Sequence, residues 1–107
     1  MTTALPDPVA TAIDATNAGD LQAFLDAFTP DGAVDDWGRV FTGPTEIAGW
    51  SDNEFIGKNV TLEVTEVTTT GADTVVIATV GGDGFNGPST FTYTVSGDKL
   101  SRMMIRE

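Results

Sequence analysis

The strongest hydrophobic pattern in the first half of the chain is that of an amphipathic helix. Four large apolar residues occupy positions i, i+3, i+4 and i+7: Leu21, Phe24, Leu25 and Phe28. Asp20 is placed to cap this helix and Thr29-Pro30 to end it. An earlier helix is predicted from Asp7-Pro8 to Gly19, and a third begins at Gly43-Pro44 and gives way to an irregular segment at residues 51–58.

The second half of the chain shows the alternation of apolar and polar residues that is typical of strands. A strand starts at Val60, and its phase breaks before Val67, which predicts a bulge near Thr65-Glu66. Residues 75–80 are apolar on both faces, so we expect this strand to lie inside the sheet. Strands at residues 90–95 and 100–105 follow, and two short strands at residues 33–37 and 39–42 precede the third helix.

This order of elements predicts an α+β fold, in which three N-terminal helices pack on one curved antiparallel sheet. With 107 residues the chain has the length of one domain, so we assign residues 1–107 to a single domain. The open end of such a cone would form a pocket between the helices and the concave face of the sheet.

Charge restricts the possible partners. Sixteen acidic and five basic residues give a net charge of −11, which would repel phosphate backbones and anionic lipid surfaces. We therefore expect neither nucleic-acid nor membrane partners. No apolar run approaches the ~18 residues of a membrane span, and the segment MTTALPDP lacks the features of a secretory signal. A cytoplasmic location is the resulting expectation.

The absence of two residue types restricts the chemistry. The chain has no Cys and no His, which excludes disulfides, thiolate nucleophiles, Ser-His triads and zinc sites built on these ligands. The acids do not have the spacing of a calcium-binding loop. We expect neither a bound metal nor a resident cofactor. Catalysis would then depend on carboxylates, Tyr93, Lys, Arg, hydroxyls or backbone groups.

Three segments resemble a known family: NAGDLQAFLDAFTPDGAV (residues 17–34), GPTEIAGW (43–50) and SGDKLSRM (96–103). They are similar to the caps, turns and core positions of the NTF2-like (SnoaL-like) family of cone-shaped α+β domains. The family includes isomerases, dehydratases, epoxide hydrolases, polyketide cyclases and domains that only bind. The resemblance therefore implies the fold and a pocket, but not one reaction.

The resemblance also points to Asp36 as a general base. Ketosteroid isomerases carry a catalytic Asp in a Val-acid-Asp sequence after the second helix, and Val34-Asp35-Asp36 matches it. On a strand, Asp35 and Asp36 point to opposite faces, so one can enter the cavity while the other stays in water. A carboxylate at an apolar cavity wall is suited to proton abstraction. The alternative for Asp36 is a solvated carboxylate at a turn.

Other catalytic groups of the family are missing from this chain. Ala12 stands in place of the isomerase Tyr, and Phe91 stands near their second oxyanion donor. The dehydratases need His, and the cyclases need an acid on a late strand, whereas residues 89–96 contain none. The epoxide hydrolases hold a water with Asp-Arg-Asp, of which Asp36 with Arg39 or Arg102 matches a part.

Further residues are predicted to contact a ligand beside Asp36: Trp37, Arg39, Trp50, Phe55 and Tyr93. Core packing is the alternative for the aromatic residues, and a surface ion pair is the alternative for Arg39. We expect residues 52–54 to form a solvated loop, with the pocket rim as the alternative.

Two functions follow from these observations. The first is a domain that binds a small, largely apolar molecule in its cone, as an isomerase, hydrolase or cyclase type of enzyme with Asp36 as the base. The second is a non-catalytic dimeric binding or scaffolding domain whose own aromatics fill the cavity. A threonine-rich face with little charge favours a homodimer in either case: Thr61, Thr65, Thr90, Thr92 and Thr94.

Overall fold

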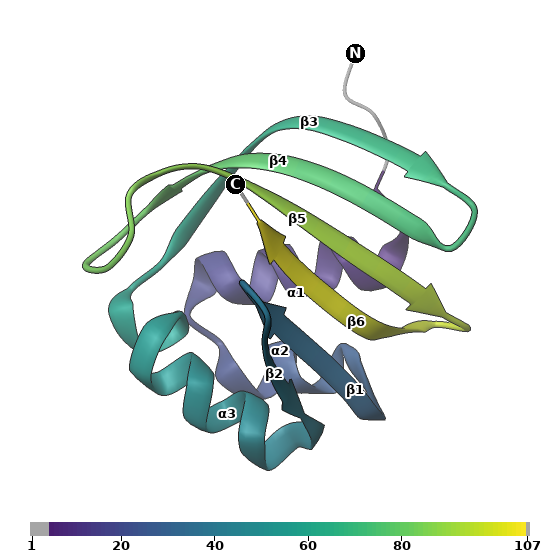
Figure 1. Ribbon diagram of the computed structural model, residues 1–107, viewed down its shortest axis with the longest axis horizontal. Coiled ribbons are helices and arrows are strands. Elements are labelled where there is room, and N and C mark those ends of the chain that lie inside the picture. Colours follow the sequence, from purple (N-terminus) through teal and green to yellow (C-terminus); the bar gives the residue numbers. More distant parts are fainter. Residues whose placement is uncertain (1–4, 107) are drawn as a thin grey trace.

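The computed structural model describes residues 5–106, which form three helices and a six-stranded sheet (Figure 1). Residues 1–4, where the segment inspected for a secretory signal begins, and residue 107 lie outside the described part. The elements follow the chain in this order: α1 (Asp7–Ala18), α2 (Leu21–Asp26), β1 (Phe28–Asp36), β2 (Arg39–Thr42), α3 (Gly43–Glu54), the 3₁₀ turn η1 (Ile56–Lys58), β3 (Thr61–Thr70), β4 (Asp73–Gly81), β5 (Gly87–Ser96) and β6 (Lys99–Arg106). The predicted α+β class is confirmed.

The sheet has the strand order β2-β1-β6-β5-β4-β3. Strands β3 to β6 form the predicted antiparallel meander, and β4 has a neighbour on each side. Strand β1 is parallel to β6 and antiparallel to β2, so it joins the two halves of the chain. The helices lie on one face of this sheet, and the core fills the space between them (Figure 1).

Curvature of the sheet comes in part from a bulge at the predicted place. The register of β3 against β4 shifts between Val64 and Glu66, and the Thr65 hydroxyl donates to the Ile77 carbonyl at 3.0 Å. An extra residue on one strand increases local twist and bends the strand. The bend turns the edge of the sheet over α1, which creates the concave face that holds the core.

The junction between α2 and β1 differs from the prediction. Helix α2 ends at Asp26, and β1 already begins at Phe28, whereas the sequence predicted a helix up to Thr29-Pro30 and a strand that starts only at residue 33. Pairing with β6 is the reason, since the Leu100 amide donates to the Ala27 carbonyl at 2.8 Å and ends the helix there. Phe28 still packs edge-on against Phe24, with ring centroids 5.2 Å apart.

Helix α3 is longer than predicted and brings its last residue to the site described below. Its N-terminus is capped by Glu46, whose carboxylate accepts the Thr42 amide at 2.9 Å. Gly49 does not end the helix, which continues to Glu54. The helices among residues 5–106 have at most 12 residues, and none is long and apolar enough to cross a membrane.

Candidate functional site

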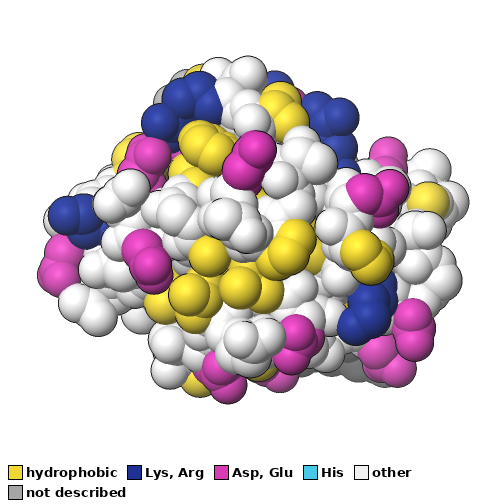
Figure 2. Space-filling view, turned by 90° about the horizontal axis from the view of Figure 1, so that it is seen from below, with side chains coloured by type: hydrophobic (Ala, Val, Ile, Leu, Met, Phe, Trp, Pro, Cys, Tyr) yellow, Lys and Arg dark blue, Asp and Glu magenta, His cyan; other side chains and the backbone are white. Residues whose placement is uncertain are grey.

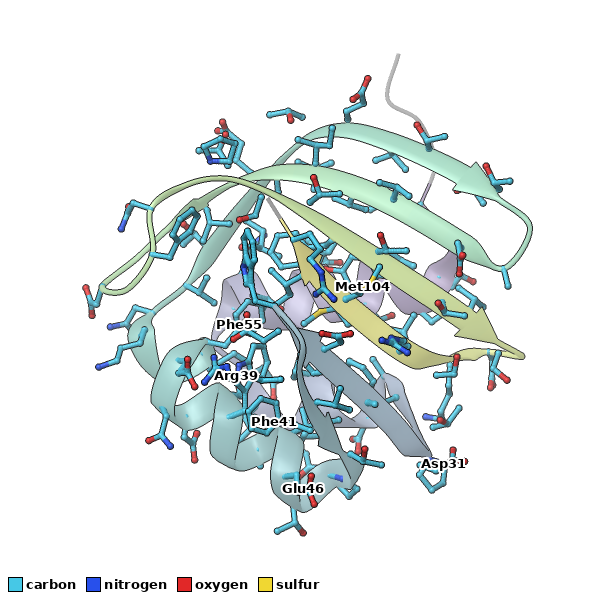
Figure 3. The ribbon with its side chains drawn as sticks, viewed as in Figure 1. Asp31, Arg39, Phe41, Glu46, Phe55 and Met104 are labelled. Atoms are coloured by element: carbon cyan, nitrogen blue, oxygen red, sulfur yellow. The ribbon has the colours of Figure 1, made fainter. Side chains whose placement is uncertain are left out.

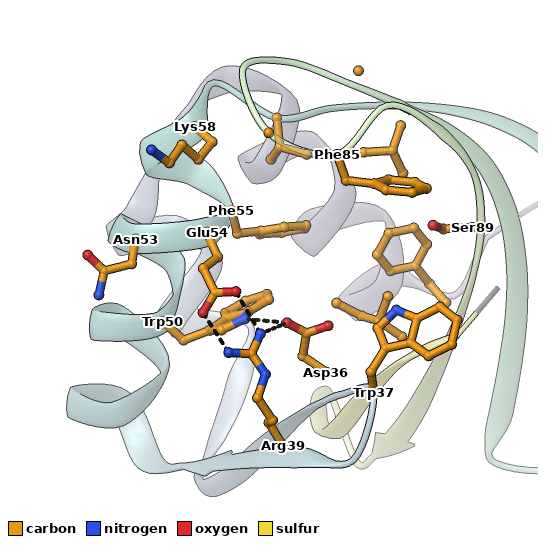
Figure 4. A pocket seen from close by; sticks show the side chains of 16 residues that line it. Asp36, Trp37, Arg39, Trp50, Asn53, Glu54, Phe55, Lys58, Phe85 and Ser89 are labelled. Carbon is orange, nitrogen blue, oxygen red and sulfur yellow. Dashed lines mark hydrogen bonds and ion pairs between the residues drawn. The ribbon is translucent and has the colours of Figure 1, made fainter.

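A cavity of about 400 Å³ opens between α3, the β1–β2 turn and the concave face of the sheet. Its deeper wall is apolar and consists of Trp50, Phe55, Val60, Val80, Phe91 and Ile105. The lining also includes polar and charged residues: Asp36, Arg39, Asn53, Glu54, Lys58 and Ser89. The aromatic residues form walls of this cavity and leave it open (Figure 4).

Asp36 faces this cavity from the end of β1. Its side chain is 15% exposed, and its Oδ2 atom accepts two hydrogen bonds, from Arg39 Nη2 at 2.5 Å and from Trp50 Nε1 at 3.0 Å. Within residues 5–106 no donor reaches the other oxygen, Oδ1. Figure 4 shows this second oxygen pointing away from the arginine into the cavity. One oxygen is therefore fixed by the protein, and the other is available to a ligand or a water.

Arg39 links two acids across the mouth of the cavity. Besides Asp36 it binds Glu54 with both terminal nitrogens, at 2.6 and 3.0 Å. The guanidinium lies 5.7 Å from the centroid of the Phe41 ring, and Arg39, Phe41 and Phe55 lie together between α3 and the β1–β2 hairpin (Figure 3). The hydrogen bonds that Arg39 donates to Glu54 and then to Asp36 raise the pKa of Arg39, while Arg39 lowers the pKa of Glu54. The result is an acid–arginine–acid trio.

The prediction that residues 52–54 form a solvated loop is wrong in this respect. Glu54 belongs to α3, and both Asn53 and Glu54 line the cavity, whereas Asp52 does not. The alternative of a pocket rim describes Asn53 and Glu54 better. No periodic pattern predicts this position of Glu54, because its pairing with Arg39 spans fifteen residues and depends on the last turn of α3.

Asp35 lies on the opposite face of β1, as its place in the strand predicts, but it is not in water. Its side chain is 6% exposed and binds Arg102 at 2.5 Å and Arg106 at 3.1 Å. It also accepts the Gly38 amide at 2.8 Å, which closes the β1–β2 turn. The hydrogen bonds from Arg106 and from the Gly38 amide lower the pKa of Asp35 to about 2. Arg102 is thus committed to Asp35 and does not reach Asp36.

Trp37 occupies the tip of that turn in an uncommon conformation. Its φ is 55° and that of Gly38 is 90°, so both central residues of the two-residue turn are left-handed. Its side chain reaches the cavity mouth and is 58% exposed, so the alternative of core packing does not hold for Trp37. Trp50 and Phe55, in contrast, are buried in the core and line the cavity at the same time.

The positions of two further aromatic residues, Phe85 and Tyr93, differ from the predicted set of ligand contacts. Phe85, in the loop between β4 and β5, is 62% exposed and lines the cavity, which the sequence analysis missed because the surrounding glycines give the loop no pattern. Tyr93 is buried beneath Phe91, with stacked rings 6.2 Å apart, and burial raises the pKa of its hydroxyl. Tyr93 is not among the residues that line the cavity.

A second groove, of about 480 Å³, lies between α2, β1 and α3. Its apolar lining consists of Leu25, Phe28, Pro30, Pro44 and Ile47. The underside of the molecule shows hydrophobic side chains gathered in a patch with acids around it (Figure 2). Lys99 lies at this groove and already donates to the Asp26 carbonyl, so the groove lacks the converging polar groups of the first cavity.

Comparison with known proteins places these features in a family context. The profile of the SnoaL-like domain matches residues 9–103. No curated protein matches the chain significantly. A candidate polyketide cyclase from Sinorhizobium meliloti is 28% identical, with 95% of each chain covered and a TM-score of 0.83.

Two further solved structures share the fold. A protein from Catenulispora acidiphila with a ketosteroid isomerase-like fold, solved in complex with trimethylamine, is 23% identical over 97% of this chain and 87% of its own, with a TM-score of 0.81. An NTF2-like protein of unknown function from Cytophaga hutchinsonii is 14% identical over 98% of this chain and 92% of its own, also with a TM-score of 0.81.

Proposed function

This chain belongs to the SnoaL-like domain family, and we propose that it binds a small, largely apolar molecule in the cavity at Asp36 and uses this residue as a general base. The supporting observation is that the two carboxylate oxygens of Asp36 have different surroundings. Oδ2 is held by Arg39 and Trp50, which fixes the side chain, and Oδ1 faces the cavity at the edge of an apolar wall. A base must be positioned in this way before it can accept a proton.

Of the three reaction types that the family suggests, the trio of Asp36, Arg39 and Glu54 favours hydrolysis. Two carboxylates separated by a guanidinium can orient a water between an acceptor and a donor. Asp36 Oδ1 would take a proton from that water while the water oxygen bonds to an electrophilic carbon of the ligand. The bond from that carbon to its leaving oxygen breaks in the same step, and the leaving oxygen takes a proton from solvent.

The test begins with the occupant. Protein purified gently from its own host is measured by native mass spectrometry, and a retained small molecule is identified after denaturation. We expect Asp36→Asn to slow turnover of that molecule, or of its closest commercial analogue, by roughly 10²–10⁴-fold, which is the usual contribution of a general base. The matched control is Asp52→Asn, because Asp52 is exposed in the last turn of α3 and does not line the cavity. Equal rates for both variants would remove the catalytic role of Asp36.

We also propose that the outer face of the sheet joins two copies of the chain. The strand register places half-buried apolar and threonine side chains on this face: Val75, Ile77, Thr90, Thr92 and Met104. The helices lie on the other side of the sheet, so this face has no cover from the described residues (Figure 1). Sedimentation velocity should give a dimer, and Ile77→Lys should give a folded monomer. A monomeric wild-type protein at micromolar concentration would contradict this proposal.

A further inference from the structure

The cavity at Asp36 is lined by aromatic rings from separate parts of the chain. Trp37 lies on the β1–β2 turn, Trp50 on α3, Phe55 after α3, Phe85 on the β4–β5 loop and Phe91 on β5. Figure 4 shows the labelled rings around the space into which the free oxygen of Asp36 points. Such a convergence of rings on one carboxylate oxygen is more than an apolar wall requires, since aliphatic side chains would suffice for that.

The rings differ in how they are packed. Trp50 stacks on Phe55 with centroids 4.8 Å apart, and Phe55 lies 6.4 Å from Phe91, so these three form a rigid wall. Trp37 and Phe85 are mostly exposed, and within residues 5–106 neither is in a ring pair with another aromatic side chain. Their faces remain free at the mouth of the cavity. Exposure of large aromatic faces is unfavourable in water unless a ligand or partner covers them.

Charge at the cavity favours a positive occupant. Asp36, Arg39 and Glu54 together carry one net negative charge, and in Figure 4 the amine of Lys58 points away from the cavity. The whole chain carries a net charge of −11, which raises the local concentration of cations at its surface. An anion would have to displace an acid from Arg39 and would then lie beside Asp36.

From this geometry we infer that the ligand is a small organic cation, whose tertiary or quaternary ammonium group lies among the aromatic rings within electrostatic reach of the Asp36 carboxylate, while its apolar remainder fills the cavity. The inference rests on the proposed binding function and names the class of its ligand. The faces of Trp and Phe rings are negative and attract alkylammonium groups, and a nearby carboxylate adds a direct attraction. A neutral ligand of the same shape fills the same space but gains no electrostatic attraction from the ring faces or from the carboxylate.

The size of the cavity agrees with a small ligand. Its volume of about 400 Å³ lies near the lower end of ligand pockets, which span roughly 300–1,000 Å³. A quaternary ammonium group has no N–H donor and a protonated tertiary amine has one, so the single free carboxylate oxygen of the cavity is a sufficient acceptor in either case. The protonated ligand or quaternary cation keeps its charge during binding, so no proton or electron has to be balanced.

Two probes of the same shape test the inference: choline, and its uncharged carbon isostere 3,3-dimethylbutan-1-ol. Their binding is measured by calorimetry and by tryptophan fluorescence, since both tryptophans of the chain line the cavity. We expect choline to bind at least about 10-fold more tightly than the alcohol, because cation–π contacts and one carboxylate together provide that preference. Asp36→Asn should reduce the choline affinity about 10-fold and leave the alcohol affinity nearly unchanged.

A second variant isolates the aromatic contribution. Phe85→Leu keeps an apolar side chain on an exposed loop, so folding is unaffected, but it removes one ring face. Choline binding should weaken about 2- to 5-fold, and alcohol binding should not. Asp52→Asn is the control for a change of one charge away from the cavity and should leave both affinities within twofold of wild type.

The outcomes separate the two proposals. If the alcohol binds as tightly as choline, the cation inference is overturned, while the proposal of a small apolar ligand stands. If neither probe binds at millimolar concentration, the cation inference also falls, and the retained ligand found by mass spectrometry decides the proposed function independently. A third probe, a peptide with trimethyllysine, distinguishes the source of the ammonium group: tighter binding of the peptide than of choline would overturn the small-molecule ligand.

Discussion

Trp37 occupies a backbone conformation that its side chain disfavours. The left-handed conformation at φ 55° is energetically unfavourable for a bulky residue, whereas Asn and Gly adopt it far more readily. The turn is nevertheless held by Asp35, which accepts the Gly38 amide, and by the Trp37 amide, which donates to Ile105 at 3.3 Å. Strain of this kind is typical of sites where a side chain has to be placed at a ligand.

We therefore predict that Trp37→Asn increases the stability of the protein and weakens ligand binding. The free energy of unfolding, measured in urea, should rise by up to about 1 kcal/mol, because the turn is relieved of strain and little buried surface is lost. Ligand affinity should fall at the same time, since the ring face at the cavity mouth is removed. A variant that is less stable by more than about 1 kcal/mol would show that Trp37 is a packing residue instead.

Asp35 should make stability depend on pH in the acid range. Its pKa of about 2 in the folded protein lies below its ordinary value of 3.8. A lowered pKa means that the stabilising contribution is complete above about pH 4 and is lost as the pH falls toward 2. Chemical denaturation is measured at a series of pH values from 7 to 2. The difference in the free energy of unfolding between wild type and Asp35→Asn should become smaller only in this window. A gap that stays constant throughout would contradict the role of the ion pairs.

The segment after α3 depends on a glycine for close contact of two backbone stretches. A Cβ atom at Gly57 would lie 1.7 Å from the Asp52 carbonyl oxygen, whereas a Cβ atom at Gly49, inside α3, meets nothing within 4 Å. The contact at Gly57 folds η1 back on the end of α3 and so sets where Phe55 and Lys58 stand at the cavity.

Alanine substitutions at these two glycines should have opposite effects. Gly57→Ala should lower the free energy of unfolding by about 1–3 kcal/mol, because the backbone has to move to accept the methyl group. Gly49→Ala should raise it by roughly 0.5–1 kcal/mol, because alanine is the better helix former at an exposed position. Both values come from chemical denaturation. Similar effects of the two substitutions would mean that the tight turn at η1 does not constrain the chain.

Local patterns in the sequence predicted most of the elements, and non-local contacts account for the differences. The end of the first helix at Gly19, the cap at Asp20 and the bulge near Thr65 are set by residues within a few positions, and they are present as predicted. The start of β1 depends instead on pairing with Leu100, so the helical spacing that ends at Phe28 was misleading.

The alternation of a strand predicted how the two neighbouring acids of β1 are divided between the faces of the sheet. That alternation separates Asp35 from Asp36, so the sequence could indicate which face each side chain takes. Glu54 and Phe85 reach the cavity through contacts between segments far apart in the chain, for which no local pattern exists. The same holds for the pairing of Asp35 with Arg106, which spans 71 residues.

The whole molecule should unfold as one unit, because its single sheet joins both halves of the chain. Leu100 is fully buried, pairs with Phe28 and donates its amide to Ala27. Leu100→Ala should cost about 2–5 kcal/mol, which is the usual range for a buried leucine. Far-UV circular dichroism, which reports on the entire sheet, and tryptophan fluorescence, which reports on the cavity, should show coincident transitions. Separate midpoints would reveal two independently stable parts.

The parallel pairing of β1 with β6 also has a consequence for the chain while it is being synthesised. Strand β1 carries Asp36, but its inner neighbour in the sheet is the last strand of the described chain. When residues 28–36 emerge from the ribosome, they can form only the short hairpin with β2. Their other neighbour, β6, is synthesised more than sixty residues later, and only then can β1 pair on both edges. Native contacts this distant in sequence slow folding and leave apolar segments exposed to chaperones and proteases. Synonymous codons that slow translation just before β6 should therefore lengthen the vulnerable period of the nascent chain, whereas the same codons after α1 should not.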